Sequence, residues 1–264
     1  MVRKSEGILT GYMALAMYLV MVATNALANI LPINGITTGE VSDNLPNLFA
    51  PAGITFSIWG VIYILLGIYS IYGLVYINRG YGDNKALKRI NQLYIVSSIA
   101  NCIWIYNWHH GNVGLTLVLM LVILVSLAYI VLTLRSVATS GDRMLWARLP
   151  FSVYFGWITI ATIANVTAYL VDIGWDGFGI SEQMWTIVVL FVGLLIGGST
   201  IWRLKDKAYG AVMVWAYMGI LLKHISQDGF DGSYPGVIVT AGIAIGIFIS
   251  IILLSSRKKK FMFD

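Results

Sequence analysis

Long apolar runs are the feature that most narrows what this chain can fold into. Eight of them follow one another, separated by short polar breaks or by glycine and proline. A helix that crosses the hydrocarbon core of a bilayer needs roughly 20 mostly apolar residues. We therefore predict membrane spans at residues 8–32, 51–78, 90–107, 112–134, 147–171, 183–202, 208–225 and 235–256.

The composition agrees with a membrane protein built from helices. Hydrophobic residues make up 58% of the chain and charged residues 11%, whereas an ordinary soluble domain is about 25% charged. Only helices and closed barrels satisfy backbone hydrogen bonds in lipid. The runs are much longer than the roughly 10-residue alternating strands of a membrane barrel. The predicted fold class is therefore all-α: a polytopic membrane helical bundle of eight transmembrane helices, one transmembrane domain over residues 1–264.

The distribution of charge predicts the orientation of these spans. Lysine and arginine concentrate in cytoplasmic loops, and 16 of the chain's 17 fall at the two ends and in the second, fourth and sixth loops. The exception is Lys223. Both termini are thus predicted to be cytoplasmic, in a multi-pass protein of a prokaryotic cytoplasmic membrane. The net charge of +5 is explained by these loops, so no nucleic-acid partner is predicted.

Several function classes lose support because their motifs are absent. The sequence has no Walker loop, G-x-S-x-G, H-E-x-x-H or C-x-x-C, and these carry nucleotide, hydrolase and zinc chemistry. No metal site is predicted, since the adjacent His109 and His110 would point about 100° apart on a helix. Few carboxylates occur in the spans, which weakens the case for an ion-coupled carrier. A small-molecule transporter or channel stays open.

Glycine pairs on two predicted helices indicate close helix packing. Gly193 and Gly197 form one G-x-x-x-G motif, and Gly242 and Gly246 form another. Small residues at this spacing let the backbones of membrane helices approach. The motifs suit packing within one chain and packing in a homodimer equally well.

Polar side chains in the middle of predicted spans are the best candidates for a functional site. Asn165 lies within the apolar stretch FGWITIATIANVTAYL, and Trp157 and Ala161 share a face of that helix. Asn101 and Trp104 are three residues apart on another span and also share a face. An asparagine in the bilayer seeks a partner. That partner is either a neighbouring helix or a bound ligand, and the two readings are compatible.

Three segments of the chain combine tryptophan with asparagine or proline: APAGITFSIWGVIYILLGIY, ANCIWIYNWHHG and GWITIATIAN. Together they resemble the TspO/translocator protein family, also called tryptophan-rich sensory proteins. The second helix of that family opens with two prolines and carries a tryptophan and a tyrosine spaced like Trp59 and Tyr63. Pro51 corresponds to the second proline, and Ala50 replaces the first.

The other two segments carry the family's asparagine motifs. The third helix of the family has Asn-Trp-x-Trp, which is represented here by Asn101 and Trp104 with Cys102 in place of one tryptophan. The fifth has Ala-Trp-x-x-x-Ala-Thr-x-x-Asn, which corresponds here to Gly156, Trp157, Ala161, Thr162 and Asn165.

The resemblance implies a five-helix bundle over residues 1–175, a fold that is often dimeric in the family. It also implies a pocket for porphyrins or related tetrapyrroles, haem included. Some members have been credited with light-dependent porphyrin breakdown, and eukaryotic members bind sterol. The basic residue that the sterol-associated segment needs is missing after Tyr169. Three predicted helices at 182–256 have no counterpart in a five-helix protein.

The function predicted from the resemblance is that of an integral membrane receptor for a hydrophobic ligand such as a porphyrin, in contact with lipid. Alternatives are a transporter or channel and a light-dependent porphyrin-degrading enzyme, although no catalytic residue is predicted. The implied ligand-binding residues are Pro51, Trp59, Tyr63, Asn101, Trp104, Trp157, Ala161 and Asn165.

Overall fold

The computed structural model describes residues 2–81, 84–137 and 145–255, and every regular element in these ranges is a helix. The chain divides into two compact units. The first consists of Met1–Asn47 and Phe56–Trp175, and the second of Leu48–Thr55 and Asp176–Asp264. The chain thus passes from the first unit into the second for one short segment and then returns.

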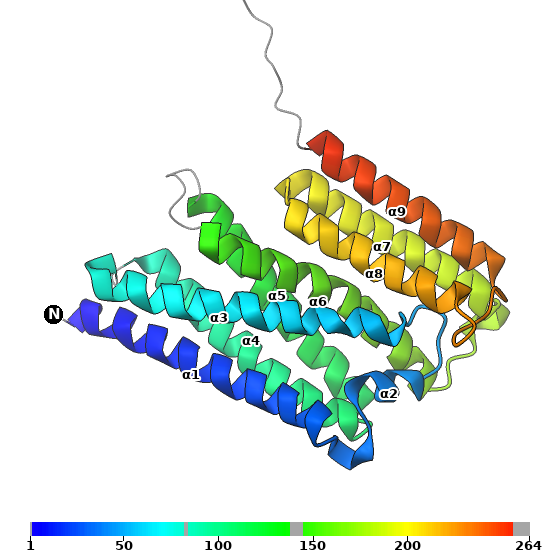
Figure 1. Ribbon diagram of the computed structural model, residues 1–264, viewed down its shortest axis with the longest axis horizontal. Coiled ribbons are helices and arrows are strands. Elements are labelled where there is room, and N and C mark those ends of the chain that lie inside the picture. Colours follow the sequence, from blue (N-terminus) through cyan, green and yellow to red (C-terminus); the bar gives the residue numbers. More distant parts are fainter. Residues whose placement is uncertain (1, 82–83, 138–144, 256–264) are drawn as a thin grey trace, which may run out of the picture. The chain divides into compact units, whose positions relative to one another are not determined.

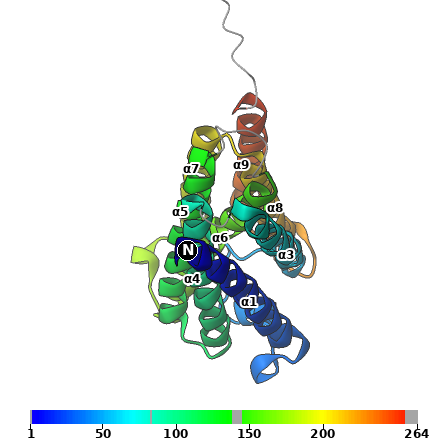
Figure 2. The same cartoon turned by 90° about the vertical axis from the view of Figure 1, so that its left-hand side faces the viewer.

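The first unit is a ring of five long helices. They are α1 (Val2–Ile30), α3 (Ile58–Tyr76), α4 (Lys85–His109), α5 (Val113–Val137) and α6 (Leu145–Asp172). Helix α1 packs against α3 and α4, α3 packs against α6, and α5 packs against both α4 and α6 (Figures 1 and 2). The ring therefore closes on itself, and side chains from α3, α4 and α6 meet inside it.

Short helices complete the first unit. The loop after α1 contains η1 (Ile33–Gly35) and α2 (Thr38–Asp43), α3 is preceded by η2 (Gly53–Ser57), and α3 runs on into the π-helical turn η3 (Ile77–Tyr81). Helix α2 begins with a capping box, in which the Thr37 hydroxyl accepts from the Glu40 amide and the Glu40 carboxylate accepts from the Thr37 amide. These bonds hold the pKa of Glu40 below its ordinary value.

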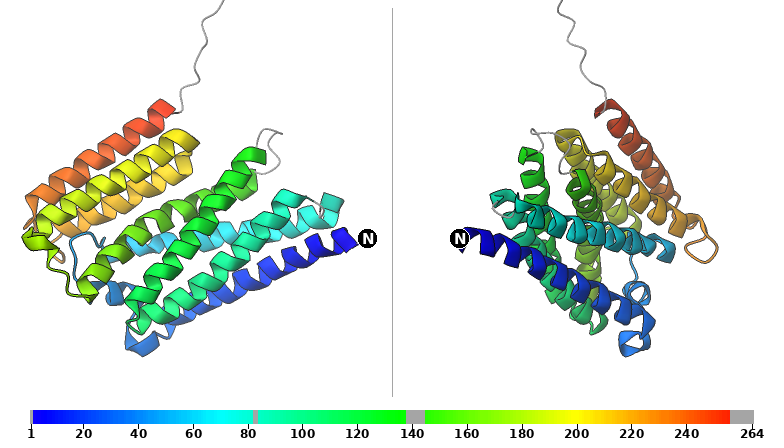
Figure 3. Two further views of the ribbon diagram at one scale, coloured as in Figure 1. Left: turned by 180° about the vertical axis from the view of Figure 1, so that it is seen from behind. Right: turned by 60° about the vertical axis from the view of Figure 1, so that its left-hand side comes forward.

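The second unit contains three long helices that all pack against one another. They are α7 (Glu182–Leu204), α8 (Lys207–Ile225) and α9 (Pro235–Ser255), preceded by η6 (Gly177–Gly179), and they lie side by side in Figure 3. Polar caps start two of them: Ser181 accepts from the Met184 amide and Asp206 from the Tyr209 amide. Such caps satisfy backbone donors that a helix leaves unpaired.

The predicted glycine motifs pack differently from each other. A Cβ atom built on Gly197 would lie 2.3 Å from Met213 Cε and 2.9 Å from Phe248 Cε1, so this glycine serves close packing inside one chain. No atom lies within 4 Å of a Cβ built on Gly242 or Gly246 in the described part of the chain.

The polytopic helical bundle predicted from the sequence is confirmed. Seven helices in the described ranges are long and apolar enough to cross a membrane, and their bounds differ from the predicted spans by at most two residues. They are Glu6–Ile30, Gly53–Gly80, Val113–Ser136, Trp146–Asp172, Glu182–Leu204, Lys207–Ile225 and Pro235–Ser255.

Helix α4, which contains the predicted span 90–107, does not meet the same criterion of hydropathy. It carries Asn91, Asn101 and Asn107, all buried, and these amides lower its mean hydropathy. Because α4 packs between α1 and α5, its polar face is covered by protein. The count of eight spans stays a prediction.

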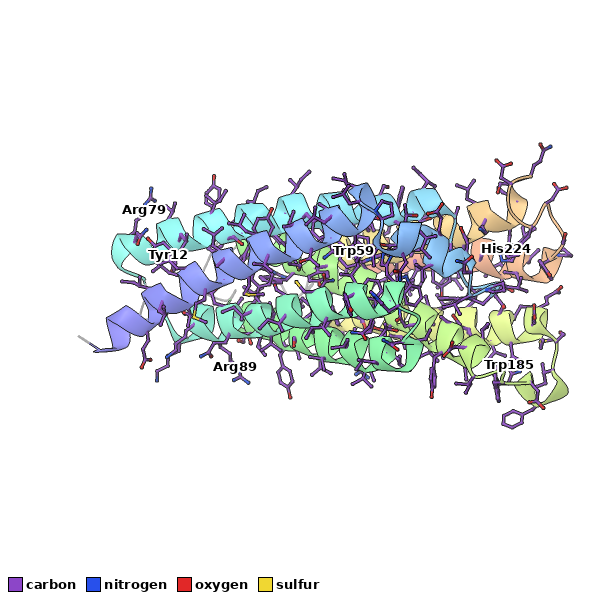
Figure 4. The ribbon with its side chains drawn as sticks, turned by 90° about the horizontal axis from the view of Figure 1, so that it is seen from below. Tyr12, Trp59, Arg79, Arg89, Trp185 and His224 are labelled. Carbon is purple, nitrogen blue, oxygen red and sulfur yellow. The ribbon has the colours of Figure 1, made fainter. Side chains whose placement is uncertain are left out.

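Basic side chains gather at one end of the first unit. Figure 4 shows Arg79 and Arg89 there, with Trp59 further along among the helices. At this end the Lys88 ammonium pairs with the Glu6 carboxylate, and the Arg89 guanidinium lies 5.9 Å from the centre of the Tyr129 ring. Arg143 and the basic run 257–260 lie outside the described residues. The cytoplasmic orientation of this end stays a prediction.

Candidate functional site

Five aromatic side chains form a cluster inside the first unit, which we call the aromatic cluster. Its members are Phe56, Trp59, Tyr63, Tyr154 and Trp157. The Trp59 ring stacks on Tyr63 at 5.6 Å between centroids, and it meets Tyr154 at 5.9 Å and Trp157 at 6.3 Å edge to face. Phe56 meets Trp157 edge to face at 5.9 Å. Trp59 is therefore the centre of the cluster.

The helical spacing of these residues explains why they meet. Trp59 and Tyr63 are four residues apart on α3, and Tyr154 and Trp157 are three apart on α6, so each pair shares a helix face. Because α3 packs against α6 in the ring, the two faces oppose each other. Tyr154 is 0% and Trp157 3% exposed, whereas Trp59 and Tyr63 are half-buried. The cluster thus has a buried back and an accessible front.

Asn101 presents an amide beside this cluster. The Asn25 Nδ2 atom donates to the Met21 carbonyl at 2.8 Å and to Asn101 Oδ1 at 2.7 Å. Since a carbonyl can only accept, the nitrogen of Asn25 is correctly placed, and the Asn101 oxygen must face it. The Asn101 Nδ2 group therefore points away from α1. It is buried and has no hydrogen-bond partner among the described residues.

Two further buried donors of the cluster lack a hydrogen-bond partner within the described ranges. They are the Trp157 indole N–H and the Tyr154 hydroxyl. The Asn101 side chain lies close to the Tyr154 hydroxyl, just short of hydrogen-bond geometry. Leaving a buried donor unpaired costs about 1–3 kcal/mol. A hydrogen-bond acceptor that reached any of these groups would remove that cost.

Asn165 is engaged with a neighbouring helix. Its Nδ2 atom donates to the Ala161 carbonyl at 3.0 Å, and its Oδ1 atom accepts from the Trp104 indole N–H at 3.2 Å. Trp104 in turn stacks on Trp108 at 5.6 Å, and the Trp108 indole donates to the Thr38 carbonyl at 3.2 Å. Asn165 and Trp104 thus link α6 to α4 and to the loop that carries α2.

The eight residues implied by the family resemblance fall into three groups. Trp59, Tyr63 and Trp157 meet in the aromatic cluster, and Asn101 lies beside it. Trp104, Ala161 and Asn165 form the α4–α6 link. Pro51 is buried in the second unit. Seven of the eight residues thus lie in the first unit, in neighbouring groups, and Pro51 lies in the second unit.

Sequence reasoning missed three side chains that contribute to the site. Phe56 and Tyr154 belong to the aromatic cluster, and Asn25 orients Asn101. Tyr154 could have been predicted, because it lies three residues before Trp157 and therefore shares its helix face. Asn25 gave a weaker one, as an asparagine in an apolar run whose partner depends on how α1 packs.

His109 is the last residue of α4, just before the turn that leads to α5. Its Nδ1 lies 3.3 Å from the Ile33 carbonyl and its Nε2 lies 3.1 Å from the Thr38 hydroxyl. Because a carbonyl only accepts, Nδ1 carries the proton and Nε2 accepts from Thr38. Burial lowers the pKa of His109. Both ring nitrogens are occupied, and in the described part of the chain no three His, Cys, Asp or Glu side chains gather as a metal site would require.

Comparison with known protein families identifies a match over almost the whole chain. The model of the TSPO-like protein family matches residues 11–254. This match extends from α1 to α9, so it includes the three helices of the second unit as well as the five of the first. No curated protein and no solved structure matches the chain. With its apolar helices, the protein is an integral multi-pass membrane protein. The chain belongs to the TSPO-like protein family.

Proposed function

We propose that this protein is a membrane receptor for a flat hydrophobic ligand such as a porphyrin or another tetrapyrrole, bound against the aromatic cluster. The observation that carries the proposal is the arrangement around Trp59. Trp59, stacked on Tyr63, meets the buried rings of Tyr154 and Trp157. The donors of Tyr154, Trp157 and the nearby Asn101 have no hydrogen-bond partner among the described residues.

The two parts of the site suit two parts of such a ligand. Trp59 and Tyr63 offer aromatic surface to a flat ring, and aromatic contacts contribute about 0.5–1.5 kcal/mol beyond area burial. The donors of Asn101, Tyr154 and Trp157 suit a carbonyl or carboxylate oxygen, since an acceptor there would end the cost of leaving them unpaired. A tetrapyrrole that carries carboxylate side groups has both features.

Titration with protoporphyrin tests the proposal through quenching of tryptophan fluorescence. We expect Trp59→Leu and Asn101→Leu to weaken binding about tenfold each, which corresponds to about 1.4 kcal/mol. Trp202→Phe is the matched control, because Trp202 is 59% exposed and lies on α7 in the second unit. If the two site variants bind as tightly as the control, the aromatic cluster is not the ligand site.

A transporter remains the second candidate because of the polar face of α4. Asn91, Tyr94, Ser98 and Asn101 follow one another at alternating spacings of three and four residues and are all buried. The Tyr69 hydroxyl donates to Asn91 at one end of this row, and Asn25 pairs with Asn101 at the other. Such a row supports a polar path through a bundle. Movement of protoporphyrin into sealed liposomes would favour this candidate, and binding without movement favours the receptor.

A further inference from the structure

We propose that helix α8 of the second unit positions the ligand site by anchoring residues 48–55, which we call the strap. The strap belongs to the second unit although the residues before and after it belong to the first. The inference rests on the proposed function, since it assigns the three C-terminal helices a part in binding the ligand. Trp215, Gly219 and His224 are the positioning residues.

Most of the strap is buried, although Gly53 and Ile54 are exposed. Leu48 is 4%, Phe49 1% and Thr55 1% exposed, and Ala50 and Pro51 are buried as well. Burial of this kind is unusual for a connecting segment, because loops ordinarily run over the surface. The strap therefore packs as part of the second unit's core.

Three hydrogen bonds attach the strap to α8 at its start, middle and end. His224 Nε2 lies 2.8 Å from the Leu48 carbonyl and must donate to it, because that oxygen only accepts. The Ala52 amide donates to the Gly219 carbonyl at 3.0 Å. The Trp215 indole N–H donates to the Thr55 carbonyl at 3.0 Å. Because these three hydrogen bonds are distributed along the strap, they oppose movement of the strap along α8.

Gly219 allows the strap to lie directly on the backbone of α8. A Cβ atom at this position would lie 2.1 Å from Thr55 Oγ1, 2.5 Å from Thr55 Cγ2 and 2.8 Å from Thr55 Cβ. All three distances are below van der Waals contact. The contact involves the root of a β-branched side chain, which cannot turn aside as a long flexible one can. Alanine at position 219 must therefore displace Thr55.

Thr55 is joined to the ligand site through one helical rod. It lies in η2 (Gly53–Ser57), which leads directly into α3 at Ile58. Phe56 follows Thr55, and Trp59 lies about one helical turn further on. On its other side the strap continues from Asn47, whose Oδ1 atom accepts from the Thr167 hydroxyl on α6 at 3.2 Å. Because Gly53–Gly80 is one continuous helical segment, we expect a shift of Thr55 to be passed along the backbone to Phe56 and Trp59.

The experiment compares two alanine substitutions on α8 in the full-length protein in lipid nanodiscs. Gly219→Ala displaces the strap. Gly210→Ala is the matched control, because its Cβ would lie 2.7 Å from Ile252 Cγ1 on α9 and touches no strap residue. We expect Gly219→Ala to weaken protoporphyrin binding about tenfold and Gly210→Ala to leave it unchanged, since misplacement by a fraction of an ångström lowers complementarity.

A size-exchange variant separates positioning from general damage. Thr55→Gly removes the Oγ1, Cγ2 and Cβ atoms that an added methyl group at position 219 would meet. The double variant Thr55→Gly with Gly219→Ala should therefore regain at least half of the lost affinity on a logarithmic scale. His224→Gln, which keeps a side-chain N–H donor, should bind more tightly than His224→Leu.

Near-ultraviolet circular dichroism of the ligand-free protein gives a readout that does not depend on the function. Coupling among Trp59, Tyr154 and Trp157 contributes to this spectrum, so Gly219→Ala should change it and Gly210→Ala should not. Unchanged dichroism in Gly219→Ala overturns the role of the strap, and so do equal affinity losses in the two alanine variants. If the wild-type protein does not bind protoporphyrin, the proposed function is wrong. A dichroism change in Gly219→Ala but not in Gly210→Ala would then still support the anchored strap.

Discussion

At the scale of single residues, the interior of the first unit combines paired and unpaired polar groups. The motif residues Trp59, Tyr63 and Trp157 could be predicted as neighbours, because their helix faces and the family pattern agree. The partner of Asn165 could not, since it depends on the order of helices in the ring. The sequence left a ligand or a helix open for this amide, and its two hydrogen bonds to Ala161 and Trp104 now favour the helix.

Ser97 and Ser98 provide a matched test of the buried hydroxyl groups. Both are 0% exposed on α4, but Ser97 Oγ donates to the Tyr94 carbonyl at 2.8 Å, whereas Ser98 Oγ has no partner among the described residues. Ser97→Ala should lower the free energy of unfolding by about 0.5–1.5 kcal/mol, and Ser98→Ala should leave it unchanged or raise it. Unfolding in mixed detergent measures both. A larger loss for Ser98→Ala would mean that its hydroxyl binds a group such as water.

Because of His109, we expect the folded protein to lose stability in mild acid. Burial lowers the pKa of its imidazole below the ordinary 6.5, so the unfolded chain binds a proton at a higher pH than the folded protein does. Stability is therefore complete above about pH 6.5 and decreases as the pH falls from there through the folded-state pKa. His109→Gln should reduce the loss of melting temperature between pH 7 and pH 5. An identical loss in the variant would assign the acid sensitivity to other groups.

At the scale of helices, hydropathy alone located seven spans to within two residues, because length and apolar content are what the bilayer selects. The start of the second predicted span agrees equally well, but its first residues do not belong to α3. The sequence LFAPAGIT reads as the opening of an apolar helix, yet residues 48–55 form the strap and α3 begins at Ile58. Only tertiary packing distinguishes a buried connecting segment from a helix of the same composition.

The two predicted glycine motifs should respond oppositely to alanine. Gly197→Ala would place a methyl group 2.3 Å from Met213 Cε and 2.9 Å from Phe248 Cε1, and overpacking of this kind costs about 1–3 kcal/mol. Gly246→Ala meets no atom within 4 Å in the described part of the chain, so it should be neutral or stabilise α9 by up to about 1 kcal/mol. Thermal unfolding in one detergent compares the pair. A clear loss in Gly246→Ala would indicate that α9 contacts a second copy.

At the scale of the whole molecule, the family match and the division of the chain bear on the same question. The sequence resemblance covered only the first five helices, whereas the family match extends through α9. The second unit is therefore part of what the family model describes. In our proposal the strap makes the start of α3 depend on α8, although no α8 residue belongs to the aromatic cluster.

The number of membrane crossings depends on α4, and this is the last prediction. If α4 spans the membrane, its burial between α1 and α5 compensates for its asparagines, since polar groups in the bilayer are tolerated where protein covers them. The turn after α4 and the loop before α7 then lie outside the cell, and the turn between α7 and α8 lies inside. In a Cys102→Ser background, Asn112→Cys and Ser181→Cys should react with an impermeant thiol reagent added to intact cells, and Lys205→Cys should react only after lysis. If α4 does not cross the membrane, every helix after it has the opposite orientation in the membrane. Asn112→Cys and Ser181→Cys would then be protected in intact cells, and Lys205→Cys would be labelled.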